Sequence, residues 1–147
     1  MTALAIREMT PADAGPLANA CAAIDPWKSL GFSPETLEAY LLRDDPALDR
    51  FVLGEQAGLM ALRRPWLRGS FLEMLAVFPQ SQGQGLGRAA IDWAKASDRS
   101  PNLWATVSAF NSSARQFYQA VGFVEVAPLP DLVATGLDEV LLRLRKA

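Results

Sequence analysis

The stretch Phe71-Leu-Glu-Met-Leu-Ala-Val-Phe78 runs directly into Pro79-Gln-Ser-Gln-Gly-Gln-Gly-Leu-Gly-Arg88. The first eight residues are apolar on both faces apart from Glu73, which is typical of a strand buried at the centre of a sheet that helices cover. From Leu86 to Ala94 the apolar residues recur at helical spacing. This order of buried strand, glycine-rich loop and helix predicts an α/β fold with the loop at the end of a central strand.

The glycine-rich loop is a candidate anion site. Gly83, Gly85 and Gly87 stand at alternate positions, where they let the backbone turn sharply and bring its amides close to a ligand. At the N-terminus of a helix, those amides and the helix dipole favour an anion, most naturally a phosphate group. Arg88 adds a positive charge nearby. A purely structural loop could carry the same glycines, so the loop alone indicates only an anion.

Two well-known phosphate-binding loops do not fit this context. The Walker loop needs a lysine followed by serine or threonine after its last glycine, whereas Arg88-Ala89 stands here. The run 85–90 nominally matches the dinucleotide fingerprint. That fingerprint needs its glycines directly after the strand and an acidic residue about 20 positions further on. The segment 105–110 contains no acid, so both alternatives fail.

The remaining elements are predicted outward from this centre. Thr10-Pro11 and Ser33-Pro34 each place a hydroxyl cap before a proline at the first helical position, which predicts helices over 11–23 and 34–43. The segment 25–31 between them reads as a loop, and residues 2–7 alternate weakly, as a strand does. Further strands are expected over 50–53, 59–63, 102–107, 123–126 and 138–144, with a turn at 54–58, a connection at 65–69 and a helix over 112–121. This order predicts a mixed α/β sheet in one domain spanning residues 1–147.

Length and composition narrow the class of protein. The chain has 147 residues and a net charge of −2, without the basic surplus that nucleic-acid binding usually needs. The single cysteine, Cys21, excludes an internal disulfide and fits a reducing cytoplasm. No apolar stretch approaches the roughly 20 residues that cross a bilayer, and no leader segment precedes the first strand. We therefore expect a cytoplasmic protein with no nucleic-acid or membrane partner.

Histidine is absent from the chain. No histidine-ligated metal centre can form, and no imidazole can act as a general base. We expect no metal, and acid–base chemistry must use carboxylates, tyrosine, lysine or water.

The loop and a later helix resemble the GCN5-related N-acetyltransferase (GNAT) family. Its central motif, Gln/Arg-x-x-Gly-x-Gly/Ala, is matched by 82–87 at every defined position. The second motif, Asn-x-x-Ala-x-x-Phe-Tyr-x-x-x-Gly-Phe, is matched by Asn111, Ala114, Phe117, Tyr118, Gly122 and Phe123. Two motifs in this order and separation are far more specific than one glycine loop. The resemblance covers about 71–126; the first seventy residues agree in element order only, and the last strand agrees loosely.

The resemblance implies a mostly antiparallel central sheet, flanked by helices and splayed at its central strands. It also implies acetyl-coenzyme A as the acetyl donor. The main chain of 75–77, where the strand would bulge and splay, would pair with the pantetheine arm, and the amides of 82–88 would hold the pyrophosphate. The implied cofactor-contacting residues are Leu75, Ala76, Val77, Gln82, Gly83, Gln84, Gly85, Leu86, Gly87, Arg88, Asn111, Ala114, Phe117 and Tyr118.

The implied reaction is direct attack of a neutral amine on a thioester. A backbone N–H near Val77 is the expected oxyanion donor. Tyr118, which is protonated at neutral pH, is the expected donor to the leaving sulfur, although its place on an apolar helix face also fits core packing. Asn111 has two compatible readings, a helix cap and a cofactor contact.

The general base and the acceptor pocket are less determined. Glu73 is the one ionisable side chain in the central strand, and a buried carboxylate is costly unless it is paired or functional. Glu73 is therefore a candidate base or acceptor-binding residue; the alternative is an ion pair with an arginine at 63, 64 or 68. Trp27 and Trp66 are candidate acceptor-pocket residues, with packing as the alternative.

The leading hypothesis is an enzyme that acetylates a primary amine on a small molecule, an amino acid, a peptide or a protein. The alternative is a non-catalytic coenzyme A-binding regulatory module with the same fold, and the presence of Tyr118 and Glu73 counts against it. A nucleotide-dependent redox module fails on the missing acid. No charge pattern in the loops selects an acceptor. Homodimers are common among such folds, and nothing in the sequence decides the oligomeric state.

Overall fold

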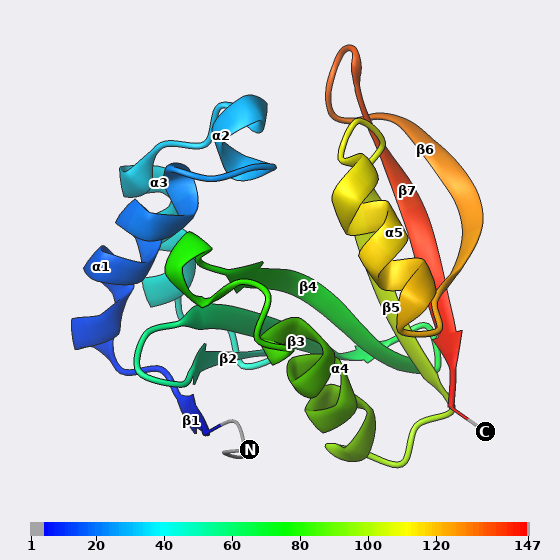
Figure 1. Ribbon diagram of the computed structural model, residues 1–147, viewed down its shortest axis with the longest axis horizontal. Coiled ribbons are helices and arrows are strands. Elements are labelled where there is room, and N and C mark those ends of the chain that lie inside the picture. The colour runs from blue at the N-terminus through cyan, green and yellow to red at the C-terminus, as the bar shows by residue number, and fades with distance from the viewer. Residues whose placement is uncertain (1–4, 147) are drawn as a thin grey trace.

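One seven-stranded sheet organises the chain in the computed structural model, which describes residues 5–146 (Figure 1). Neighbouring strands are antiparallel except for β4 and β5, which are parallel. This confirms the predicted mixed, mostly antiparallel sheet. In the order in which they pair, the strands are β1 (Ile6–Glu8), β2 (Leu48–Leu53), β3 (Gly58–Trp66), β4 (Gly69–Val77), β5 (Asn102–Ser108), β7 (Leu137–Arg145) and β6 (Val124–Ala134).

The four longer helices agree with the prediction, and two short helical elements were not predicted. The loop expected over 25–31 contains a one-turn helix, α2, because the chain turns tightly between Pro26 and a left-handed Gly31. Of the weak strand expected over 2–7, residues 2–4 lie outside the described part of the chain. The helices are α1 (Pro11–Ala22), α2 (Trp27–Leu30), α3 (Pro34–Leu42), a 3-10 turn (Pro79–Ser81), α4 (Leu86–Ala96) and α5 (Ser112–Ala120).

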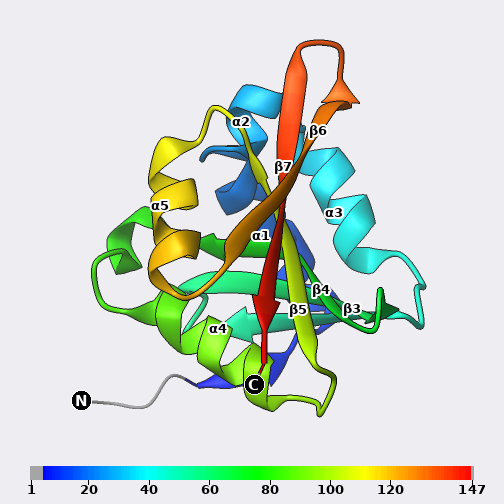
Figure 2. The ribbon, with the colours of Figure 1, turned by 90° about the vertical axis from the view of Figure 1, so that its right-hand side faces the viewer.

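The sheet carries a hydrophobic cluster on each face. One cluster joins the sheet to α1 and α3 through Leu17, Leu41 and Leu59. The other joins it to α4 and α5 and includes Ile91 and Tyr118. Figure 2 shows the two pairs of helices on opposite sides of the strands. Any site within the sheet is therefore reached from two different helical layers.

A β-bulge at Glu73 decides which side chains of β4 face which layer. Ala61 pairs with Met74 while the next residue, Leu62, pairs with Leu72, so Glu73 is an extra residue in β4. The alternation slips by one position, which leaves Leu72 on the α4/α5 face but turns Met74 to the α1/α3 face. The bulge expected at 75–77 thus lies two positions earlier.

The two parallel strands separate after four residue pairs. β4 and β5 pair from Gly69 with Asn102 to Leu72 with Ala105, and no further pairs follow. Figure 1 shows the two strands diverging from that end. The predicted splay of the central strands is confirmed.

Two predicted boundaries are wrong. The short strand expected over 123–126 continues as β6 to Ala134. β6 is the edge strand, where Pro128 and Pro130 need not donate to a second neighbour. The connection expected over 65–69 is also shorter, because Pro65 and Trp66 still belong to β3. In residues 5–146, no helix combines the length and the apolar character needed to cross a bilayer.

Candidate active site

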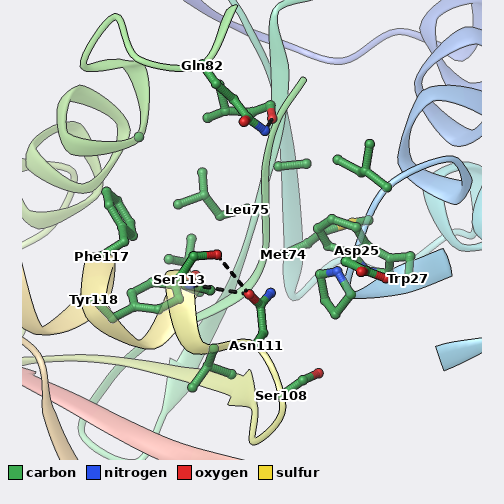
Figure 3. A pocket seen from close by; sticks show the side chains of 18 of the residues that line it. Asp25, Trp27, Met74, Leu75, Gln82, Ser108, Asn111, Ser113, Phe117 and Tyr118 are labelled. Atoms are coloured by element: carbon green, nitrogen blue, oxygen red, sulfur yellow. Dashed lines mark hydrogen bonds between the residues drawn. The ribbon is translucent and has the colours of Figure 1, made fainter. Parts of the chain in front are cut away.

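A cavity of about 750 Å³ lies where β4 and β5 separate (Figure 3). The ends of both strands, the glycine-rich loop, α5 and the segment 24–30 line it, so the cavity brings the two sequence motifs together. Of the predicted site residues, Gln84 and Trp66 are not among those that line it. The ones that do are Trp27, Glu73, Leu75, Ala76, Val77, Gln82, Gly83, Gly85, Leu86, Gly87, Arg88, Asn111, Ala114, Phe117 and Tyr118.

The glycine-rich loop presents unpaired amides at the start of α4. Gly83 and Gly85 both have φ of +79°, a conformation that L-residues avoid, and a Cβ at either would meet no atom within 4 Å. Among the described residues, the amides of Gly83, Gln84 and Gly85 donate to no backbone group. With the free amides of the first turn of α4, they form a cradle that fits a phosphate or pyrophosphate group.

Gly87, which lines the cavity, also has a packing role. A Cβ there would lie 3.0 Å from Cζ of Phe117, so this glycine allows α4 and α5 to pack closely. Two side chains hold the loop in place: Gln82 Nε2 donates to the carbonyl of Val77 at 2.9 Å, and Arg88 reaches the carbonyl of Ala120 at 3.5 Å. The loop is thereby fixed to both β4 and α5.

The end of β4 offers unpaired main-chain groups to the cavity. The Phe78 N–H donates to the carbonyl of Ala57 at 2.9 Å, towards β3. Because main-chain groups alternate along a strand, those of Leu75 and Val77 point the other way. The Val77 carbonyl is taken by Gln82, which leaves the Val77 N–H and both groups of Leu75. There β5 has already diverged. These groups can pair with an extended polar chain, as peptides do when they add to a strand edge.

The start of α5 is capped by Asn111. Its Oδ1 accepts hydrogen bonds from the backbone N–H of Ala114 and from Ser113 Oγ, each at 3.3 Å. The capping interpretation is confirmed. Asn111 also lines the cavity, as Figure 3 shows.

Tyr118 packs its ring in the core and keeps its hydroxyl free. It is 8% exposed, and its ring meets those of Phe117 and Phe123 edge to face, each at 5.3 Å. No side chain among the described residues hydrogen-bonds to the hydroxyl. Burial, with a contribution from Glu139, raises the pKa of Tyr118 well above its ordinary value. The group therefore holds a proton at neutral pH, and the packing and chemical readings are compatible.

Glu73 is held by two side chains. Its Oε1 accepts from Arg63 Nε at 2.8 Å, and its Oε2 accepts from Arg63 Nη2 at 3.2 Å and from the Tyr40 hydroxyl at 2.6 Å. Arg63 also binds Asp45 at 3.0 Å. The ion pair considered from the sequence is thus present, and Arg63 is its partner. Arg64 pairs elsewhere, with Asp98 at 3.2 Å.

The two tryptophans lie in different places. Trp27 lines the cavity opposite Phe117 and Tyr118 (Figure 3). Trp66 stacks on Phe71 with ring centres 4.8 Å apart and meets Trp104 edge to face. Its neighbours belong to the part of the sheet where β4 and β5 are still paired. The structure therefore does not bring Trp66 to the cavity.

Glu139 is a cavity residue that sequence reasoning missed. It is 7% exposed, lies directly opposite Ser108 in the β5–β7 ladder, and accepts a hydrogen bond from Ser108 Oγ at 2.7 Å. Burial raises the pKa of this carboxyl, and hydrogen bonds from Ser108 and Thr106 oppose the rise. The available signal was a carboxylate directly before the apolar run 140–142.

Similar solved structures cover nearly the whole chain. An acetyltransferase from Thermus thermophilus is 26% identical, with a TM-score of 0.79 over 99% of this chain and 98% of that one. A spermidine N-acetyltransferase from Vibrio cholerae, in complex with CoA and spermine, is 20% identical, with a TM-score of 0.74 over 97% and 95%. A nourseothricin acetyltransferase is 21% identical, with a TM-score of 0.73 over 98% and 99%. No curated protein sequence matches the chain.

The acetyltransferase (GNAT) domain matches residues 38–125. This match contains the bulged strand β4, the glycine-rich loop and the helix that carries Tyr118, and it spans more than half of the chain. The GNAT fold uses acetyl-coenzyme A. The chain is an acyltransferase and belongs to the GNAT family of acetyltransferases.

Proposed function

We propose that this enzyme transfers the acetyl group of acetyl-coenzyme A to a primary amine by direct attack. The observation that carries the proposal is the splay itself. It places the unpaired amides of the glycine-rich loop, the unpaired edge of β4 and the free hydroxyl of Tyr118 around one cavity. An enzyme that binds a phosphorylated, strand-like thioester needs these three elements together.

The residues present fit the donor. The amides of Gly83, Gln84 and Gly85, with Arg88, would hold the pyrophosphate, and Leu75 and Val77 would pair with the amide-rich pantetheine arm. Asn111, Ala114 and Phe117 would line the same arm from α5. Acetyl-coenzyme A supplies an acetyl group activated as a thioester. The Vibrio cholerae structure that contains CoA supports this choice of ligand.

The chain supplies two further groups for the chemistry. The N–H of Val77 faces the gap and would stabilise the oxyanion that develops on the thioester oxygen. Tyr118 keeps its proton because burial raises its pKa, and it would give that proton to the departing sulfur. Both assignments depend on groups that no other part of the described chain occupies.

Glu73 is better suited to binding the acceptor than to removing its proton. Its oxygens already accept three hydrogen bonds from Arg63 and Tyr40. Arg63 and Tyr40 thus hold the carboxylate in place as a fixed part of the cavity wall. We therefore propose that Glu73 and Trp27 line the acceptor side of the cavity. The names of the spermidine and nourseothricin acetyltransferases support an amine acceptor.

Ligand-dependent thermal stability tests the donor. At a hundredfold excess over Kd, acetyl-coenzyme A should stabilise the protein by about 2.7 kcal/mol, which raises the Tm of a chain of this length by roughly 5–10 °C. NAD and ATP should leave the Tm unchanged. An unchanged Tm at a large excess of acetyl-coenzyme A would contradict the proposal.

Substitution of Tyr118 tests the chemistry. Tyr118→Phe keeps the ring packing and removes the hydroxyl, so kcat for thiol release with an amine should fall about 100-fold or more. The Kd for acetyl-coenzyme A should stay within about twofold, because the ring still lines the cavity. Thiol release at the wild-type rate would exclude Tyr118 as the proton donor. If no amine from a broad panel yields thiol with the wild-type protein, the non-catalytic module is the better description.

A further inference from the structure

The cavity has two chemically different sides. Along β5, Ala105 and Val107 belong to the cluster under α4 and α5, so Ser108, one position on, faces the opposite layer. Along β7, Val140 belongs to the same cluster, so Glu139 also faces away from it. Ser108 and Glu139 thus open to the cavity from the face that carries α1 to α3, whereas Tyr118 opens to it from α5.

The charges that line the cavity are divided in the same way. Arg88 is the one basic side chain among the described lining residues, and it lies at the start of α4. The acidic lining residues are Asp25, Glu73 and Glu139, from the segment before α2, from β4 and from β7. The first side suits an anionic donor, and the second suits a cation.

Glu139 differs from the other two carboxylates. Asp25 is exposed and accepts from Ser29, and Glu73 is paired with Arg63. Glu139 is buried and is bound by the neutral hydroxyl of Ser108, and no cation among the described residues pairs with it. A buried carboxylate without a cation is costly, which is typical of a group kept for function.

We propose that Glu139 receives the ammonium group of the acceptor and takes its proton, with Ser108 holding the carboxylate in position. This inference rests on the proposed acetyl transfer and names its acceptor class. The acceptor is an alkyl primary amine without a carboxylate beside the amine. An α-amino acid would place its own carboxylate among the three acidic side chains.

The proton balance is complete without any further reactant. The ammonium gives one proton to the Glu139 carboxylate, and its freed lone pair forms the C–N bond to the carbonyl carbon. The C–S bond breaks, its electron pair leaves with the sulfur, and Tyr118 protonates that sulfur. The nitrogen releases a second proton to water, and water restores Tyr118 while the Glu139 acid returns its proton to solvent. Overall, the nitrogen loses two protons, of which one is gained by the sulfur and one by solvent.

The surroundings of Glu139 set the pH dependence. Thr106 and Ser108 of β5 and Leu129 of β6 do not titrate. Burial raises the pKa of Glu139, so kcat/KM should fall as the pH drops through that raised pKa, where the base becomes protonated. The titratable groups that line the same cavity are Tyr118 of α5, Glu73 of β4 and Asp25 before α2, and Asp138 adjoins Glu139 in β7.

Glu139→Gln keeps the shape and the hydrogen bond from Ser108 but removes the base. With n-propylamine as acceptor, kcat/KM for thiol release should fall about 100-fold or more, and the fall of kcat/KM at low pH should disappear. Titration calorimetry of the CoA complex should show weaker binding of n-propylamine, with the Kd for CoA unchanged. Ser108→Ala should lower kcat/KM less and keep the fall at low pH. Glu55→Gln, in the exposed β2–β3 turn, is the matched control and should behave as wild type.

Three results would overturn the inference: wild-type kcat/KM in Glu139→Gln, an unchanged pH profile in that variant, or glycine accepted as efficiently as n-propylamine. If Glu139→Gln does not fold, the same test is made on Ser108→Ala, from its pH profile of kcat/KM and its Kd for n-propylamine. A different result tests the proposed function itself: wild-type protein that binds acetyl-coenzyme A yet releases no thiol with any amine.

Discussion

Replacing Gly83 or Gly85 with alanine should weaken the binding of acetyl-coenzyme A although the methyl group contacts nothing. Both glycines have φ of +79°, and a Cβ at either meets no atom within 4 Å. The effect therefore cannot come from a clash. It comes from the backbone, because the left-handed conformation that these two positions adopt in the loop is unfavourable for alanine.

The magnitude follows from that backbone cost. An L-residue in the left-handed region costs about 1–2 kcal/mol. If the loop keeps its shape, the free energy of unfolding falls by this amount and the Kd is unchanged. If the loop of the free protein relaxes, binding must restore the left-handed shape, and the Kd rises about 5- to 30-fold. The loss of unfolding free energy and the loss of binding free energy should sum to about 1–2 kcal/mol. Because the loop is exposed and can relax, we expect most of the loss in the binding free energy.

Gly136 provides a matched control. It has φ of +83° in the β6–β7 turn, and its Cβ would also meet nothing within 4 Å. Gly136→Ala shares the backbone cost and the effect of alanine on the unfolded chain, but it lies outside the cavity lining. Urea denaturation and calorimetry with acetyl-coenzyme A measure both quantities for all three variants. Equal weakening of acetyl-coenzyme A binding by Gly136→Ala, or no loss of either kind in Gly85→Ala, would refute the reasoning.

Two further predictions concern the charged groups around the sheet. Arg63→Ala should lower the free energy of unfolding by about 2–3 kcal/mol, because it removes the charged donor to Glu73; Arg43→Ala, whose ion pair is more exposed, should cost under about 0.5 kcal/mol. Equal losses in urea denaturation would contradict this ranking. Hydrogen bonds from Arg7 and Thr10 lower the pKa of Asp13 far below its ordinary value. The charged carboxylate therefore stabilises the fold fully when the pH is above the ordinary pKa of an aspartate. This stabilisation is lost as the pH falls towards the lowered pKa. Between about pH 5 and pH 2 the wild type should therefore lose more stability than Asp13→Asn, and parallel curves in acid titrations of unfolding would rule this out.

The sequence predicted the elements whose signal is local. The buried strand, the glycine-rich loop and the helix that begins after Asn111 each have their pattern within a dozen residues, and the structure has all three. The splay was expected because the resemblance to the GNAT family, which two motifs carry, implies it. The length of β6 was not predictable in this way. Pro128 and Pro130 indicate a loop unless it is known that the strand lies at an edge.

The parts that were missed depend on partners far apart in the chain. Glu139 is recognisable as a site residue only beside its hydrogen-bond partner Ser108, which lies 31 positions earlier. Only the strand order brings the two together. Glu73 was recognised as unusual, but its partner Tyr40 lies on another helix. Trp66 resembles a pocket residue in its own segment and packs on Trp104 in the fold. The periodicity of the sequence predicts which face of a helix or strand a side chain occupies. The order of the strands and helices in the fold determines which other residues it contacts there.

The splay also determines what shape of molecule can use the unpaired edge of β4. An unpaired edge on the outside of a sheet accepts almost any extended chain, including a second copy of the same protein. Here the edge faces inward and is flanked by β5 and α5 on one side and by the segment 24–30 on the other. A polypeptide would need room for side chains on both faces, whereas a narrow unbranched chain does not. A chain that pairs with this edge must therefore lie between these elements, a requirement that an edge on the outside of the sheet does not impose.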